Sequence, residues 1–363
     1  MTRNLSIFLD LLRLFAALLV VIGHAGALYH IAMPDIIAHS AKEGVAIFFV
    51  LSGFVIGYVT SGKERDWRSF ARARALRLYS VVPLALVVII SCYWVGVRLT
   101  PDIYLHEVGH APDWPSMLRY LTFTNELWFD RVLVSTAAPF WSLGFEVAYY
   151  AGFAVLIYAR GAWRWGLAAL WLLAVGPRVA LAFPLWLLGA GAWALVQRRR
   201  PVSTGMGIAI LCGLATTALV LRRVYGSLAS PLFEWPVAAA LVPSMSYYLA
   251  LCAVLAAAIV VFAATVGDRR FWPATAERAI RYCAGASFTL YIMHVPLMLL
   301  IAAIWPATIG SPMRSGAALA ITTGLILILA ELGERRKAAY ARAFSMSFRV
   351  FTIGKRKTAT AID

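Results

Sequence analysis

Long apolar runs, separated by short polar segments, make up most of this 363-residue chain. Ten runs can be counted, and most approach the roughly 20 residues that a helix needs to cross a bilayer. They cover residues 7–28, 45–61, 78–97, 139–159, 163–176, 179–196, 205–221, 244–266, 286–305 and 315–332. A helix satisfies every backbone polar group within one segment, as lipid requires, and the runs lack the alternation of barrel strands. The pattern therefore predicts an all-α polytopic membrane protein with about ten transmembrane helices.

The charges between these runs predict how the helices are oriented. With the N-terminus placed in the cytoplasm, the inner segments hold about 24 of the 33 Lys and Arg residues and the outer loops about 8. Cytoplasmic loops carry an excess of basic residues of this kind. We therefore expect both termini in the cytoplasm, with a transmembrane domain over residues 1–335 and a basic cytoplasmic tail over residues 336–363.

Composition excludes a water-soluble fold and argues against a nucleic-acid partner. The chain is 62% hydrophobic and only 14% charged, too few charges to cover a soluble protein of this size. Its net charge of +16 comes from basic residues spread between apolar runs, so we expect no nucleic acid. The Ala25-Gly26-Ala27 tripeptide resembles a signal-peptidase site, but Asp10 and Arg13 interrupt the preceding run and argue against cleavage.

Charged and titratable groups within the runs are the first candidates for chemistry, because such groups are costly in a bilayer. Asp10, Arg13 and His24 all lie in the first run. Arg13 and His24 share a helix face roughly 16 Å apart, so Arg13 lies near the cytoplasmic side and His24 near the opposite side. Snorkelling of Arg13 and an interfacial His24 would explain both without chemistry. Glu146, in the fourth run, needs a cation, a histidine or water as a partner, and a structural ion pair is the alternative.

Polar and aromatic residues of other runs extend this set. His294 lies near the middle of the ninth run, where a packing hydrogen bond is as common as a functional role. Arg74 and Arg77 lie at the inner mouth of the third run, where a positive-inside loop also explains them. Ser52 and Gly53 permit close helix packing as well as a site. The remaining candidates for lining a site are Phe49, Trp141, Ser142 and Tyr291.

The order of these residues resembles that of the acyltransferase family 3 membrane proteins, which modify bacterial surface polysaccharides and some smaller acceptors. Arg13 and His24, with ten residues between them, are similar to the family's motif of a basic residue followed by histidine. Further similar segments follow in the family's order at residues 44–56, 70–79, 141–146 and 290–296. The resemblance covers nearly the whole chain, although residues 160–280 align only as hydrophobic helices.

Two departures from the family pattern accompany the resemblance. Family members often have a proline and aromatic residues soon after the arginine motif, where this chain has Ser80-Val81-Val82-Pro83-Leu84. This weakens the assignment of Arg74 and Arg77 more than that of His24. Some members carry a C-terminal extracytoplasmic esterase-like domain, which we do not expect here because the segment after residue 332 is short and basic.

The resemblance implies transfer of an acyl group, commonly acetyl, from cytoplasmic acyl-CoA to a hydroxyl of a cell-envelope or exported glycan. It implies His24 as general base and Glu146 as its catalytic partner, with no metal and no bound cofactor. The phosphates of acyl-CoA would be bound by Arg13, Arg74 and Arg77, since arginine suits bidentate phosphate contact. The lipid bilayer, here the bacterial inner membrane, is the remaining partner. The residues expected to line the site are Asp10, Phe49, Ser52, Gly53, Trp141, Ser142, Tyr291 and His294.

A transporter or flippase for a lipid-linked or anionic solute is the rival hypothesis, because intramembrane Arg, Glu and His residues are typical of transporters as well. The sequence contains no inverted or parallel repeat of the kind common in transporters. A non-catalytic membrane scaffold is a third hypothesis. The acceptor, the acyl group, the oligomeric state and the choice between a covalent acyl-enzyme and direct transfer stay open.

Overall fold

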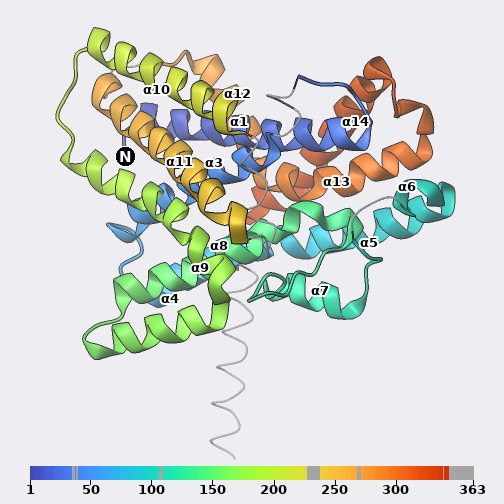
Figure 1. The fold of residues 1–363 in the computed structure, drawn as a ribbon, viewed down its shortest axis with the longest axis horizontal. Coiled ribbons are helices and arrows are strands. Elements are labelled where there is room, and N and C mark those ends of the chain that lie inside the picture. The colour runs from blue at the N-terminus through green and yellow to red at the C-terminus, as the bar shows by residue number, and fades with distance from the viewer. Residues whose placement is uncertain are drawn as a thin grey trace, which may run out of the picture.

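The protein is a bundle of long helices (Figure 1). The computed structural model describes residues 1–34, 37, 40–105, 109–226, 238–267, 271–337 and 339–342, without the side chains of residues 238–243. This part of the chain contains no β-strand, and nine of its helical segments are long and apolar enough to cross a membrane. The prediction of an all-α polytopic membrane protein is therefore confirmed. The helices are α1 (Arg3–Leu28), α3 (Ala41–Thr60), α4 (Trp67–Tyr79), α5 (Val82–Leu99), α6 (Pro101–Leu105), α7 (Trp114–Leu121), α8 (Trp141–Tyr158), α9 (Ala162–Arg198), α10 (Thr204–Tyr225), α11 (Ala238–Val266), α12 (Ala274–Ala284), α13 (Ser287–Ile304) and α14 (Pro312–Leu332), with short 3-10 turns η1 (Ser135–Phe140), η4 (Pro306–Thr308) and η5 (Glu334–Arg336).

Helix α9 accounts for the difference between nine segments and ten predicted runs. Its 37 residues contain both the fifth and the sixth run, which meet at a bend at Gly176. Gly176 has a φ of 77°, which favours glycine, and a Cβ there would lie 2.6 Å from the Cα of Trp128. Pro177 follows and cannot donate a helical hydrogen bond. The two predicted runs are thus two helical arms of α9 that meet at a non-helical kink at Gly176 (Figure 1).

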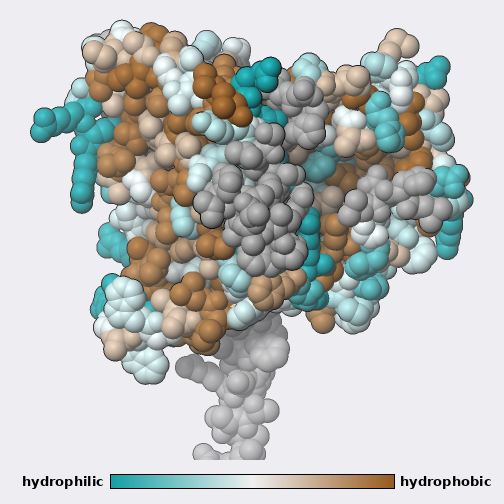
Figure 2. Space-filling model, viewed as in Figure 1, coloured by the Kyte–Doolittle hydropathy of each residue, from teal (hydrophilic) through white to brown (hydrophobic). Residues whose placement is uncertain are grey.

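Helix α13 lies at the centre of the bundle and α10 at its edge. Within their most apolar stretches, 83% of the α13 residues are buried, against 6% of the α10 residues. Helix α13 packs against α1, α5 and α14, while α3 packs mainly against α1 and α9. Figure 2 shows hydrophobic side chains over much of the face that α9, α10 and α11 form, as a lipid-facing surface requires. Side chains of α13 are therefore shielded from lipid.

Contacts between loops agree with the predicted alternation of the helices. Arg3, at the predicted cytoplasmic end of α1, donates a hydrogen bond of 2.9 Å to Glu277 of α12, which is also predicted to be cytoplasmic. This hydrogen bond lowers the pKa of the Glu277 carboxyl to about 2. On the predicted outer side, the N–H of Gly310 donates to the carbonyl of Tyr29 at 2.7 Å. Both contacts join segments that were assigned to the same side of the membrane.

Helices α3 and α9 approach each other closely through two glycines. A Cβ on Gly53 would lie 2.0 Å from the carbonyl oxygen of Trp186, and a Cβ on Gly189 would lie 1.9 Å from that of Val50. Apolar lipid supplies little hydrophobic drive for helix association, so small residues that allow backbone contact stabilise such pairs. Gly53 therefore contributes to helix packing, one of the two roles that the sequence left open for it.

The segment between α7 and α8 contains a buried ion pair. Arg178 donates to the carboxylate of Glu126, and their side chains are only 3% and 2% exposed. Arg178 was counted among the outer-loop charges from the sequence, but it follows the Gly176 bend and points into the protein. A buried charge needs a partner to offset its lost hydration, so this pair holds the α7–α8 segment against α9.

Candidate functional site

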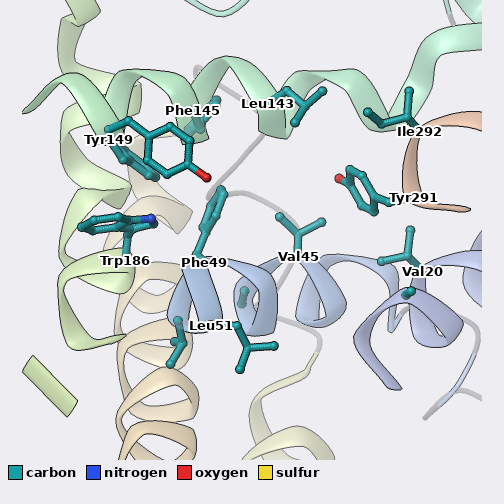
Figure 3. Packing of buried hydrophobic residues seen from close by; sticks show 14 of the residues in the cluster. Val20, Val45, Phe49, Leu51, Leu143, Phe145, Tyr149, Trp186, Tyr291 and Ile292 are labelled. Carbon is teal, nitrogen blue, oxygen red and sulfur yellow. The ribbon is translucent and has the colours of Figure 1, made fainter. Parts of the chain in front are cut away.

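A cavity of about 120 Å³ lies among α1, α3, α4, α8, α13 and the segment after α14. Val45 and Phe49 of α3 face Leu143 of α8 across this region (Figure 3). Tyr291 of α13 lies on the side of Val45 that is away from Phe49. Both acidic and basic side chains also reach the cavity wall. They are Arg13, Arg77, Glu146, Glu334 and Lys337.

The Glu146 carboxylate has two hydroxyl donors. Ser52 Oγ donates to Glu146 Oε1 at 2.7 Å, and the Tyr150 hydroxyl donates to the same oxygen. Ser52 Oγ and the Tyr150 hydroxyl are themselves 3.3 Å apart. Tyr150 lies one helical turn after Glu146 on α8, so the two side chains share a face. The hydroxyls fix the carboxylate in the cavity wall and satisfy one of its oxygens.

The basic side of the cavity combines residues from three distant parts of the chain. Arg13 pairs with Asp10 at 3.2 Å, and Asp10 also contacts Arg281 at 3.3 Å. Among the described residues, neither Arg77 nor Lys337 has a side-chain hydrogen-bond partner. Glu334 attracts the charge of Lys337, while Arg77 and Arg13 lie close enough to repel it. An anion in the cavity would relieve this repulsion and supply acceptors for Arg77 and Lys337.

Arg74 differs from Arg77, although both lie on α4. Its Nη2 donates to Glu64 Oε1 at 2.7 Å. Its guanidinium also lies 5.4 Å from the ring centre of Phe70 and 5.7 Å from that of Tyr150. Arg74 is not one of the residues that line the cavity. Through these contacts, Arg74 holds the loop after α3 against α4 and α8.

His24 and His294 form a contact between α1 and α13. Nδ1 of His24 lies 3.0 Å from Nε2 of His294, and the ring centres are 5.1 Å apart. His294 is fully buried, and its Nδ1 lies 2.9 Å from the carbonyl oxygen of Leu290. From the sequence, we expected Glu146 beside His24. The structure instead gives His24 a second histidine as its side-chain partner.

Of the α13 residues that line the cavity, Tyr291 is the one nearest along the helix to His294. It lines the cavity, and His294 follows it by three residues on α13, on the same side of the helix. The Tyr291 hydroxyl contacts Ser142 Oγ at 2.7 Å and donates to the Pro139 carbonyl at 3.1 Å. Phe48 contacts the Tyr291 ring edge to face, with ring centres 5.3 Å apart. His294 therefore lies about one helical turn beyond the part of α13 that lines the cavity.

The structure brings most, but not all, of the predicted residues to one place. His24 and His294 form the adjacent pair, and Asp10 reaches the cavity only through Arg13. Trp141 stacks edge to face on Phe145 with ring centres 5.4 Å apart, and it does not line the cavity. The predicted residues that line the cavity are Arg13, Phe49, Ser52, Arg77, Ser142, Glu146 and Tyr291, whereas Arg74, Gly53, Trp141, His24 and His294 do not.

Three titratable residues of this region, Tyr150, Glu334 and Lys337, were not predicted from the sequence. Tyr150 had a signal, because it is four residues after Glu146 on a helix. Glu334 and Lys337 had none, because they follow the last apolar run in a segment that reads as polar tail. Lys337 belongs to the predicted tail, of which residues 343–363 lie outside the described residues.

No metal site accompanies these groups in the described part of the chain, where no three His, Cys, Asp or Glu side chains are placed to hold one.

A family model described as an acyltransferase domain matches residues 6–331, nearly the whole chain. No curated protein and no solved structure matches the chain significantly. The family match contains every residue predicted for the site, and it ends before Glu334 and Lys337.

Proposed function

The chain belongs to acyltransferase family 3, and from this premise we propose that it moves an acyl group from cytoplasmic acyl-CoA to a hydroxyl acceptor. Acetyl is the proposed acyl group, and a cell-envelope or exported glycan is the proposed acceptor. The bacterial inner membrane is the proposed location. The single observation that supports a CoA donor most strongly is the cavity in which Arg13, Arg77 and Lys337 converge.

The chemistry of coenzyme A suits this basic wall. Its diphosphate and 3′-phosphate carry several negative charges, and its acyl group lies at the end of a long, narrow pantetheine arm. Arg77 and Lys337 have donors that no described side chain accepts, so phosphate oxygens can take them without breaking an existing pair. The arm would then extend along Phe49 and Tyr291 towards the histidine pair.

His24 is the proposed general base. As the acceptor oxygen attacks the thioester carbonyl, its proton passes to the His24 ring, and a new C–O bond forms. The tetrahedral intermediate then collapses, the C–S bond breaks, and the sulfur leaves with the electron pair and takes the proton from His24. The products are an acyl ester and CoA thiol, and no covalent enzyme intermediate is needed. In this proposal Tyr291, which lines the cavity one helical turn before His294, moves aside so that the thioester can reach the ring.

Glu146 acts in this proposal from within the cavity. Its carboxylate holds the hydroxyls of Ser52 and Tyr150, and it attracts Arg77 across the cavity. It therefore places polar groups along the path of the thioester and keeps Arg77 turned inward. This role differs from direct orientation of His24, because among the described residues the side-chain partner of His24 is His294 and those of Glu146 are Ser52 and Tyr150.

The test uses full-length protein reconstituted in lipid nanodiscs. Acetyl-CoA carrying a radiolabelled acetyl group is supplied on its own and then with a preparation of exported bacterial glycans. We expect saturable binding of acetyl-CoA, release of CoA thiol that depends on glycan, and label on the glycan that mild base removes as acetate. Binding of acetyl-CoA without any thiol release would contradict the proposal, and transport of an anionic solute by the same protein in sealed vesicles would favour the transporter hypothesis.

A further inference from the structure

The contact between His24 and His294 determines which nitrogen of each ring carries a proton. The carbonyl oxygen of Leu290 can only accept a hydrogen bond, so the proton at the 2.9 Å contact belongs to Nδ1 of His294. A neutral imidazole carries one proton, so Nε2 of His294 then has a free lone pair. That lone pair faces Nδ1 of His24 at 3.0 Å.

Both rings are expected to be neutral in this arrangement. His294 is fully buried, and no carboxylate acts on either ring within the described residues. An imidazolium without a counter-charge is costly in such surroundings. The contact therefore consists of one donor and one acceptor, with His24 as the donor.

The same logic assigns the His24 proton to Nδ1. That nitrogen donates to His294 Nε2, and the carbonyl of Val20 is a further backbone acceptor for the ring. Val20 lies four residues before His24, as Leu290 does before His294, and the nearer ring nitrogen, Nδ1, makes that kind of contact in His294. The contact with His294 thus places the proton on His24 Nδ1, and Nε2 of His24 carries the lone pair.

We infer that His294 is a positioning residue that holds His24 in the Nδ1–H tautomer, so that Nε2 of His24 is the atom that accepts the hydroxyl proton. This inference rests on the proposed function of His24 as general base. In the transfer, the acceptor oxygen gives its proton to Nε2, forms the C–O bond, and the proton later passes from Nε2 to the departing sulfur. A carboxylate often holds the base of hydrolytic triads in this way. Here a neutral, buried imidazole anchored to the backbone of α13 replaces it.

Nitrogen NMR of the histidine rings tests the inference directly and does not depend on activity. Full-length protein with ¹⁵N-labelled histidine is placed in lipid bilayers, and the His24 signals are assigned by their loss in His24→Gln. We expect the wild-type His24 ring to show a protonated Nδ1 and an unprotonated Nε2 at neutral pH. A proton on His24 Nε2 in the wild type would overturn the inference.

Two substitutions at position 294 separate positioning from packing. His294→Leu fills the space but removes the acceptor, whereas His294→Gln can still accept from His24 through its side-chain carbonyl. With acetyl-CoA as donor and exported glycans as acceptor, we expect His294→Leu to lower kcat on the order of 10- to 100-fold, with KM for acetyl-CoA nearly unchanged. His294→Gln should stay within a few-fold of the wild type.

The outcomes also separate this inference from the proposed function. Equal losses of kcat in His294→Leu and His294→Gln, or wild-type rates in both, would contradict the positioning role. Full activity of His24→Ala would contradict the proposed function itself. The tautomer measured in the unsubstituted protein would still stand or fall independently of that result.

Discussion

Glu334 accepts two hydrogen bonds from Thr289, at 3.0 Å from the backbone N–H and 3.1 Å from the side-chain hydroxyl. Thr289 lies in the first turn of α13, where backbone N–H groups have no partner within the helix and attract negative charge. The contact ties the segment after α14 to the central helix. It thereby keeps Lys337, three residues further on, at the cavity wall.

Lys337→Gln should weaken the use of acetyl-CoA. We expect KM for acetyl-CoA to rise about 5- to 10-fold, with little change in kcat, because the lost contact is one with phosphate in both ground and transition states. Initial rates at varied acetyl-CoA concentration measure both constants. Arg336→Gln is the matched control, since Arg336 is exposed beside it and does not line the cavity. Equal effects of the two substitutions would show that only general surface charge matters.

Arg77 and Arg74 should respond differently to the same substitution. Arg77→Gln removes donors that face the cavity, so we expect weaker binding of acetyl-CoA, by roughly 10-fold or more, and nearly normal thermal stability. Arg74→Gln leaves Glu64 without its partner, and we expect a loss of about 1–3 kcal/mol in stability with little change in binding. Calorimetric titration with acetyl-CoA and thermal unfolding of the same samples measure both properties. The reverse pattern would contradict the assignment of Arg77 to the donor.

Glu146→Gln should damage catalysis more than assembly. The amide keeps an acceptor for Ser52 and Tyr150 but loses the charge that attracts Arg77. We expect the transfer rate to fall at least about 10-fold while the protein still elutes as a folded species. Ser52→Ala, which removes one hydrogen bond and keeps the charge, should have a smaller effect. Loss of folded protein with a normal rate per folded molecule would favour a purely structural Glu146.

The apolar runs predicted the helices well, because a membrane-spanning helix satisfies its backbone hydrogen bonds within its own segment and needs no distant partner for them. The bend in α9 illustrates the limit of this reasoning. Gly176 and Pro177 are visible in the sequence, but they do not reveal that Trp128 packs directly over the bend. That contact explains why position 176 must be glycine, because a Cβ there would meet Trp128.

The candidate site was predictable only for residues that lie on one helix at a recognisable spacing. Arg13 and His24 share a helix face through their spacing, and the structure places Arg13 at the cavity wall and His24 against His294. The pairing of His24 with His294 joins residues 270 positions apart, and no helical periodicity predicts such a contact. Lys337 escaped prediction for the same reason, because its segment is polar and becomes part of the site only through Glu334 and Thr289.

The buried pair of Glu126 and Arg178 gives a stability prediction away from the site. Arg178→Met alone would leave the Glu126 carboxylate buried and unpaired, so we expect a loss of about 3–5 kcal/mol. The double substitution Arg178→Met with Glu126→Gln should recover most of that loss, because no unpaired charge remains. Thermal unfolding in detergent or nanodiscs measures this. A double variant as unstable as Arg178→Met would show that the two charges do not depend on each other.

The most direct test of the whole account compares wild-type protein with His24→Ala in nanodiscs, with radiolabelled acetyl-CoA and exported glycans present. The account predicts that His24→Ala folds, binds acetyl-CoA as tightly as the wild type and transfers acetyl at least about 100-fold more slowly. Transfer by His24→Ala at the wild-type rate would contradict it.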